Sequence, residues 1–254
     1  MKKTFITLLA LTGAASAATL TELATMDELA ALSGDTGTSV KSVVTLNDVT
    51  TYEFTGAGSI LKIDDEDIMS YITGGKGYLT IAAWIKPDST SVNSIFSVGG
   101  QNDGFKFALY DGGLQATTKG VLDTDVGTSA LGYDSIPTDS WTLVALTINL
   151  SESGDSRFYM GTVDGKYATR QLGGWNDLTA DGSYMAIGSG NTADVRDGYD
   201  GMIAGLTLFS SDGLVNNSDI AAKMSAAPVL IPEPTTATLS LLALAGLAAR
   251  RRRR

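Results

Sequence analysis

The sequence of 254 residues contains no cysteine and no histidine. Without histidine there is no imidazole base, no Ser-His-Asp triad and no histidine ligand for zinc. Without cysteine there is no disulfide, thiol nucleophile, iron–sulfur cluster or thiolate metal site. Any catalysis by this chain therefore depends on carboxylates, Lys, Tyr, Ser or a carboxylate-bound metal.

Positive charge is also scarce, and much of it lies at the two ends of the chain. Lys and Arg total 18 against 28 Asp and Glu, which gives a formal net charge of -10. Lys2, Lys3 and the arginines at 250–254 lie outside the central body, so that body is more acidic than the whole chain. An acidic surface repels phosphate, and we expect no nucleic-acid partner.

Residues 1–17 have the pattern of a secretory signal peptide. Two lysines precede an apolar stretch at 5–11, and the small residues Ala15-Ser16-Ala17 follow it. This order is typical of an exported protein with an A-x-A cleavage site. We expect export and cleavage after Ala17 or Ala18. An N-terminal core helix is the alternative, and it fits poorly because the apolar stretch ends in small residues.

The other end of the chain carries three elements in order. Pro232, Glu233 and Pro234 precede an uncharged stretch at 235–249, which is followed by the terminal arginines. As a helix this stretch would measure about 22 Å, which is short of the hydrocarbon core of a bilayer at about 30 Å. A processed sorting tail explains this order better than an ordinary anchor helix, which is the alternative.

Residues 231–254 resemble the PEP-CTERM sorting signal of Gram-negative bacteria. The resemblance implies an exosortase-type membrane protease as a processing partner and transient membrane contact through a C-terminal hydrophobic helix. It also implies a location in the cell envelope, at the cell surface or in an extracellular matrix rich in exopolysaccharide.

Between the two ends, the sequence predicts a helical lead-in at 18–38 and one all-β domain at 39–228. A capping-box pattern at Thr19 and Glu22, apolar residues at three-residue spacing and a stop at Gly34 favour the helix. Short β-branched and aromatic runs, separated by Gly, Asp, Asn and Ser, predict the strands. Those runs are 39–46, 51–54, 60–63, 78–86, 94–98, 105–110, 114–118, 141–150, 157–163, 167–171, 184–187 and 202–209, with a closing helical turn at 219–224. Short strands without intervening helices indicate a β-sandwich or jelly roll.

Several of these runs, in order, resemble the LamG-like jelly roll of the concanavalin A-like lectin/glucanase superfamily. Residues 79–87 resemble its "tisaWvkP" strand, and residues 141–147 resemble its "W-x-x-v-A-x-t" strand. Weaker matches lie at 52–59, 157–166, 187–188 and 199–203. Independently, the alternation along 79–86 is that of a strand covered on both faces, which makes Trp84 and Trp141 core residues.

The strongest candidate for catalysis is the acidic run Asp64-Asp65-Glu66-Asp67. Retaining glucanases of this fold use an E-x-D-x-x-E strand that holds nucleophile and acid about 5–5.5 Å apart. Here Lys62 occupies the first acidic position, and four acids in a row favour a solvated loop or a helix start. We therefore predict no catalytic residue and no enzyme activity.

Relatives with this fold often bind calcium near the first glycine turn and on the closing strand. The matching positions in this chain are Thr55, Ser59, Ala204 and Gly205. None is a carboxylate, and calcium needs six to eight oxygens with charge among them, so we expect no cofactor at the usual site. An acid-rich loop is an alternative calcium site, with a solvated surface loop as the competing interpretation. Its residues are Asn191, Asp194, Asp197 and Asp200.

Sugar binding is the remaining chemistry. Trp175 follows two glycines and precedes Asn176 and Asp177, in a predicted loop with little local apolar support. An exposed aromatic face with polar neighbours is suited to a glycan, whereas packing of Trp175 over a sheet edge is the alternative.

Three classes of function follow from these observations. The first is an exported, non-catalytic structural or adhesive component of the envelope or exopolysaccharide matrix. The second is a carbohydrate-binding, lectin-like module that uses Trp175. The third, a glycoside hydrolase or lyase, has the least support. Fold class does not decide among them, because this fold hosts all three.

Overall fold

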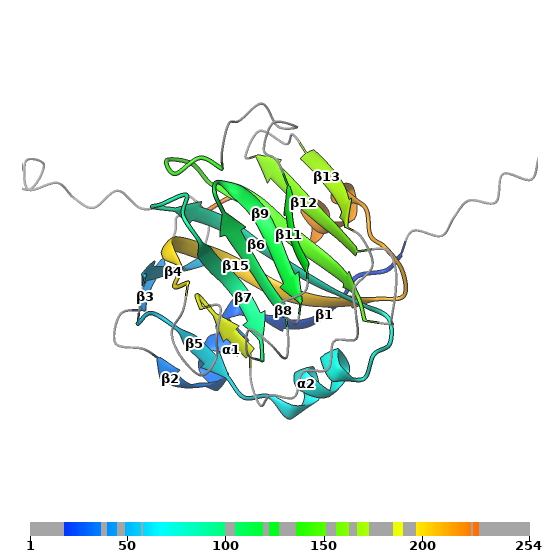
Figure 1. The fold of residues 1–254 in the computed structure, drawn as a ribbon. Coiled ribbons are helices and arrows are strands. Elements are labelled where there is room, and N and C mark those ends of the chain that lie inside the picture. Colours follow the sequence, from blue (N-terminus) through cyan, green and yellow to red (C-terminus); the bar gives the residue numbers. More distant parts are fainter. Residues whose placement is uncertain are drawn as a thin grey trace, which may run out of the picture.

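The structure is a computed structural model that describes residues 18–36, 40–44, 49–56, 58–99, 105–118, 122–126, 136–150, 156–162, 167–172, 185–189, 197–224 and 226–228. Two antiparallel sheets pack face to face, and the short helices α1 and α2 lie along the same side of the sandwich (Figure 1). This arrangement confirms the prediction of a two-sheet β-sandwich with a few short helices.

The first sheet runs in the order β13-β12-β11-β6-β15-β4-β3, and β1 also pairs with β15. Its strands are β1 (Thr21–Thr25), β3 (Lys41–Val44), β4 (Thr50–Thr55), β6 (Tyr78–Pro87), β11 (Thr142–Asn149), β12 (Ser156–Thr162), β13 (Tyr167–Leu172) and β15 (Asp200–Ser211). One edge of β15 is shared between β4 at residues 200–204 and β1 at residues 207–210. On the other edge of β15, the register of its pairing with β6 shifts between Ala204 and Thr207. Gly205 lies in this interval and has a φ of +56°, a conformation that favours glycine.

The second sheet runs in the order β10-β9-β8-β7-β14-β5-β2. Its strands are β2 (Ser33–Thr36), β5 (Leu61–Ile63), β7 (Asn93–Val98), β8 (Phe105–Tyr110), β9 (Gly113–Thr118), β10 (Leu122–Val126) and β14 (Met185–Ile187). The helices are α1 (Met26–Leu32), α2 (Glu66–Thr73) and α3 (Asn217–Lys223).

The main core fills the space between the sheets. Alternate residues of β6, from Leu79 to Ile85, point into it. Phe107 on β8 and Phe158 on β12 stack across it, with ring centroids 5.9 Å apart. Burial of these large side chains between two sheets supplies the main hydrophobic stabilisation of the sandwich.

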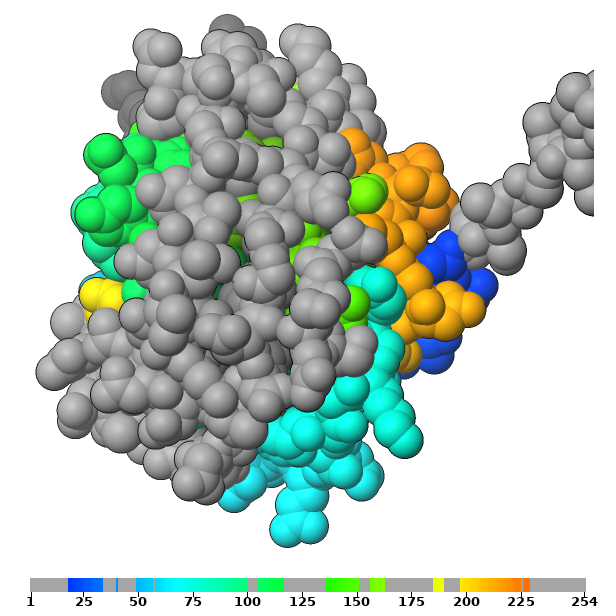
Figure 2. Space-filling view, turned by 45° about the vertical axis from the view of Figure 1, so that its right-hand side comes forward, coloured from blue at the N-terminus to red at the C-terminus, as the bar shows by residue number. Residues whose placement is uncertain are grey.

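A second apolar cluster covers the outer face of the first sheet. Trp84 and Trp141 belong to it and are only 6% and 9% exposed, which confirms both as core residues. Leu20, ahead of β1, and Ile220, on α3, complete the cover. Figure 2 shows the N-terminal segment, in blue, against the orange chain that includes α3. Both ends of the described chain therefore pack on one face of the first sheet.

The N-terminal prediction was wrong in its boundaries. A helix is present, but it covers only Met26–Leu32, and the residues before it form β1. The capping box is made by Thr25 and Glu28, not by Thr19 and Glu22. Gly34 does not stop the helix but lies within β2, which pairs with β5. Pairing with the free edges of β15 and β5 outweighs the local helical pattern on either side of α1.

The other predicted elements are largely confirmed. Each predicted strand is present with ends shifted by a few residues, and the closing turn is α3. Strands β1, β2 and β10 were not predicted. Within the described part of the chain no helix is long and apolar enough to cross a bilayer. The predicted sorting helix at 235–249 lies outside that part.

Candidate functional site

Three connections meet at one end of the sandwich, where Thr55, Asp197 and Asp200 of the predicted calcium residues lie. They are the turn after β4, the segment between β6 and β7, and the residues that lead into β15. The Gly56 N–H donates to the Tyr199 carbonyl at 2.8 Å, and the Asp88 N–H donates to the Asp200 carbonyl at 2.9 Å. The backbone therefore fixes these three connections relative to one another.

Asn93 organises this end and was not identified from the sequence. Its side chain is buried, and its amide donates to the carbonyls of Ser89 at 2.8 Å and Ser91 at 3.2 Å. Its Oδ1 accepts the Asp200 N–H at 3.1 Å. The local signal was an Asn after a serine-rich turn, where Asn side chains commonly bond nearby backbone groups. The bond to Asp200 had no local signal.

The residues at the usual calcium positions do not all come together. Thr55 lies opposite Asp200, whereas Ala204 lies opposite Thr51, four residues along β15 or roughly 13 Å away. The buried Ser59 Oγ accepts the Thr55 N–H at 2.9 Å and lies 3.0 Å from Thr55 Oγ1. The carboxylate beside the glycine turn is therefore Asp200, which the sequence pattern had assigned to a different loop.

The alternative calcium loop is described only in part. Asn191 and Asp194 lie outside the described residues. Asp197 accepts a hydrogen bond from Lys106 Nζ at 3.0 Å and forms an ion pair with it. Calcium requires negative oxygens that are free to coordinate it, and this ion pair competes for Asp197. Among the residues that the structure describes, no three carboxylates cluster in a way that could hold a metal ion.

Tyr199 is the buried titratable group of this end. Burial, followed by the negative charges of Asp88 and Asp200, raises the pKa of Tyr199 well above its ordinary value. Its hydroxyl donates to the Met202 carbonyl at 3.3 Å, and its ring meets that of Phe54 edge to face at 6.0 Å. Tyr199 is therefore a protonated packing residue.

The acidic run lies at the start of α2. A helix start was one of the two arrangements predicted for it, the other being a solvated loop. Asp65 is the N-cap, and its Oδ1 accepts the Ile68 N–H at 2.8 Å. Glu66 and Asp67 occupy the first turn, where negative charge is favourable at a helix N-terminus. Lys62 lies on β5, between Ala186 of β14 and Asp35 of β2. These acids therefore form a helix start and not a strand face with paired carboxylates.

The remaining predicted residues lie outside the described chain: Trp175, Asn176 and Asp177, the cleavage residue Ala17, and the sorting residues Pro232, Glu233 and Pro234. Within the described chain, Tyr110 is the aromatic residue that is exposed, at 44%. It ends β8, and the next residue, Asp111, has a φ of +48° in the turn to β9. Tyr110 was not identified from the sequence, although the strand at 105–110 that it ends was predicted.

Solved structures that are similar to this chain share its fold at low sequence identity. Two mutants of HCR/D align with a TM-score of 0.50 at 15% and 16% identity, over 73% and 74% of this chain and 45% of each of those chains. The botulinum neurotoxin serotype D ligand binding domain, in complex with N-acetylneuraminic acid, aligns with a TM-score of 0.47 at 14% identity, over 74% of this chain and 44% of that one. The chain thus spans less than half the length of these structures, and the likeness shows the fold alone. A search of the curated proteins found no match.

A family model described as the concanavalin A-like lectin/glucanases superfamily matches residues 56–220. The match extends from the glycine turn after β4 to α3 and covers more than half of the chain. It includes both motif strands around Trp84 and Trp141. The chain therefore belongs to the concanavalin A-like lectin/glucanase superfamily.

Proposed function

We propose that the protein is exported and acts as a non-catalytic structural or adhesive component of the cell envelope or exopolysaccharide matrix. The export signal at 1–17 and the ordered elements at 231–254 support delivery to a Gram-negative envelope by a PEP-CTERM/exosortase-type route. The acidic body is suited to an exposed, soluble surface domain.

One observation carries the non-catalytic part of the proposal: three of the side chains considered for catalysis or calcium binding bond to the protein itself. The Asp65 carboxylate caps α2, and Ser59 is bonded to Thr55. Asp197 is paired with Lys106. A retaining glycosidase instead needs two carboxylates that face one groove about 5–5.5 Å apart.

The delivery part is tested by the intact mass of protein recovered from the envelope of the bacterium that makes it. We expect a mass that lacks residues 1–17 and the tail from about Pro232. A strain without its exosortase-type protease is the matched control and should retain the tail. Recovery of surface-exposed protein that still carries residues 250–254 would contradict the proposed route.

A carbohydrate-binding, lectin-like module is the second candidate, and exposed Tyr110 favours it. An aromatic ring beside a polar turn offers a stacking face for a sugar. A glycan array with the processed protein tests this candidate, with Tyr110→Ala and Trp175→Ala as separate variants. Loss of a signal in one variant alone assigns the contact. An array without signal for the unmodified protein would remove this candidate.

A further inference from the structure

A groove lies between α1 and α2. Helix α1 connects β1 of the first sheet to β2 of the second, and α2 connects β5 of the second sheet to β6 of the first. The cavity between them measures about 480 Å³. This volume is within the range of about 300–1,000 Å³ that is typical of ligand pockets.

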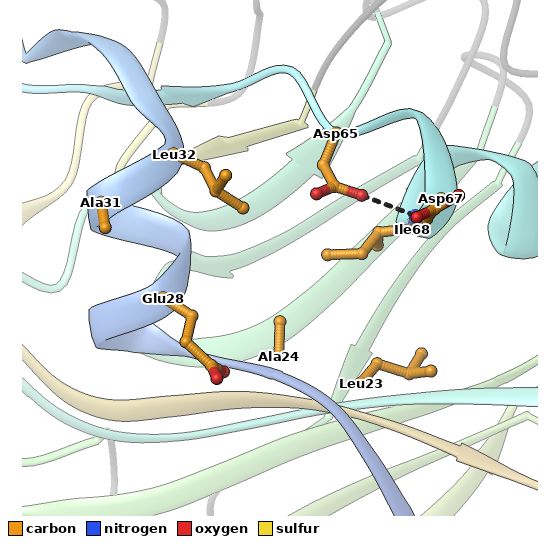
Figure 3. A pocket seen from close by; sticks show the side chains of 8 residues that line it. All are labelled: Leu23, Ala24, Glu28, Ala31, Leu32, Asp65, Asp67 and Ile68. Atoms are coloured by element: carbon orange, nitrogen blue, oxygen red, sulfur yellow. Dashed lines mark hydrogen bonds between the residues drawn. The ribbon is translucent and has the colours of Figure 1, made fainter.

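The walls and floor of the groove are aliphatic. Figure 3 shows Leu32 of α1 and Ile68 of α2 on opposite sides, with Leu23 and Ala24 of β1 below them. Leu32 is 46% exposed, a high value for a large apolar side chain. An exposed apolar groove is a common feature of interaction surfaces.

The rim of the groove is negative. Glu28, Asp65 and Asp67 line it, and none of its lining residues is basic. Glu28 Oε2 accepts the Thr25 N–H at 2.8 Å and the Thr25 hydroxyl at 2.9 Å, which holds this carboxylate at the groove. Within the described chain, none of these three carboxylates has an ion-pair partner. An apolar segment that ends in positive charge would therefore complement the groove in both shape and charge.

The chain carries one such segment. Residues 235–249 are uncharged and rich in leucine, and five arginines follow them. If these residues are helical, Leu244, Leu247 and Arg251 share one face by their spacing. With residues 229–234 extended and 235–249 helical, the chain from Pro228, the last described residue, to Arg250 spans up to about 42 Å. A domain of this size is about 40 Å across, so the helical tail is about as long as the domain is wide and can reach a groove on a neighbouring face.

We propose that the groove between α1 and α2 binds residues 235–254 of the same chain before the tail is processed. The leucines fill the apolar groove and the arginines meet its acidic rim. The contact keeps an apolar tail out of water, and removal of the tail opens the groove in the mature protein. This inference goes beyond the proposed envelope role but rests on the proposed processing of the tail, whereas the contact itself is tested in the unprocessed chain.

Cysteine cross-linking tests the contact cleanly, because the chain has no cysteine of its own. Leu32→Cys is combined with Leu247→Cys in the unprocessed chain and treated with a short bismaleimide. The control pair is Tyr110→Cys with Leu247→Cys. Tyr110 is about as exposed as Leu32. It lies near Asn93, which follows the end of β6, whereas α2 precedes the start of β6. Tyr110 therefore lies at the far end of the sandwich from the groove. Matching circular dichroism spectra and melting temperatures establish that all variants are folded.

We expect several-fold more intramolecular cross-link from the Leu32 pair than from the Tyr110 pair, at a yield independent of protein concentration. Glu28→Gln combined with Asp67→Asn should lower that yield, as should about 1 M NaCl, which shortens the screening length to about 3 Å. Equal yields from the two pairs would overturn the proposal. So would a cross-linked dimer that increases with protein concentration, which would show that a second copy supplies the tail.

Discussion

Gly188 and Phe54 lie so close together that a side chain at position 188 would overlap the Phe54 ring. Gly188 follows β14 in the second sheet and has a φ of +83°, while Phe54 is a fully buried residue of β4 in the first sheet. The Gly188 carbonyl also accepts the Tyr199 N–H at 2.8 Å. This contact therefore joins the two sheets beside the end where the three connections meet.

Gly188→Ala should destabilise the fold strongly. The new Cβ overlaps the Phe54 ring, and the backbone conformation is unfavourable for alanine, so we expect a loss of about 2–4 kcal/mol. Gly56→Ala is the matched control, because its φ of +75° is similar and no atom lies within 4 Å of the position that its Cβ would occupy. It should cost about 1–2 kcal/mol. Equal losses in urea unfolding would show that the Phe54 contact adds nothing to backbone strain.

Tyr52 should make stability depend on pH in the alkaline range. Its hydroxyl donates to Asp27 Oδ1 at 3.1 Å, which ties β4 to α1. Burial, followed by the charge of Asp27, raises the pKa of Tyr52 from 10.0 to about 12. The folded state therefore prefers the protonated phenol, so this stabilisation is complete below pH 10 and is lost as the pH rises towards about 12.

Tyr52→Phe tests this dependence. The variant should lose about 1 kcal/mol at neutral pH, because the hydrogen bond to Asp27 is removed. Its stability should then fall less steeply than that of the unmodified protein above pH 10. If the denaturant midpoints of the two proteins fell equally with pH above pH 10, Tyr52 would not be the group that causes the loss of stability.

Calcium at millimolar concentration should change the melting temperature by less than about 2 °C. The reason is that Asp197 is already paired with Lys106 and that Thr55 and Ser59 bond to each other. A site saturated a hundredfold above its Kd would add about 2.7 kcal/mol. A shift of many degrees that EDTA reverses would reveal a calcium site in the loop at 191–200 or in another cluster. Lys106→Gln is a useful second variant, since it releases Asp197.

Trp84→Ala and Trp175→Ala should differ widely in stability. Trp84 is buried in the second apolar cluster, and its truncation should cost about 3–5 kcal/mol. Trp175 lies in a predicted polar loop, and a solvent-facing tryptophan should cost less than about 1 kcal/mol. Denaturant melts of the two variants compare them directly. Equal costs would make Trp175 a packing residue and would leave the lectin candidate to Tyr110 alone.

Much of the sandwich was predictable because its strands alternate clearly and end at strong turn residues. Residues 78–86 show this best, since their two faces belong to two separate clusters. β1 was not predictable, because its identity depends on the edge of β15 that it pairs with, about 190 residues away. Two capping-box patterns, at Thr19 and at Thr25, fit the local sequence, and only that pairing selects the second.

The site was less predictable, because its contacts also join residues that are distant in sequence. Lys106 and Asp197 are distant in sequence, and no local pattern indicates their ion pair. Strand register decides that Asp200, and not Ala204, lies opposite Thr55. By contrast, the helix start at Asp65 was recognisable, since capping depends on neighbouring residues.

We propose that this domain belongs to the envelope matrix and does not cleave its polymers. The most direct test incubates the processed protein with exopolysaccharide from the bacterium that makes it. Protein that sediments with the polymer and new reducing ends are measured in the same sample, with heat-denatured protein as the control. We expect association with the polymer and no increase in reducing ends. A steady release of reducing ends, or no association at all, would contradict it.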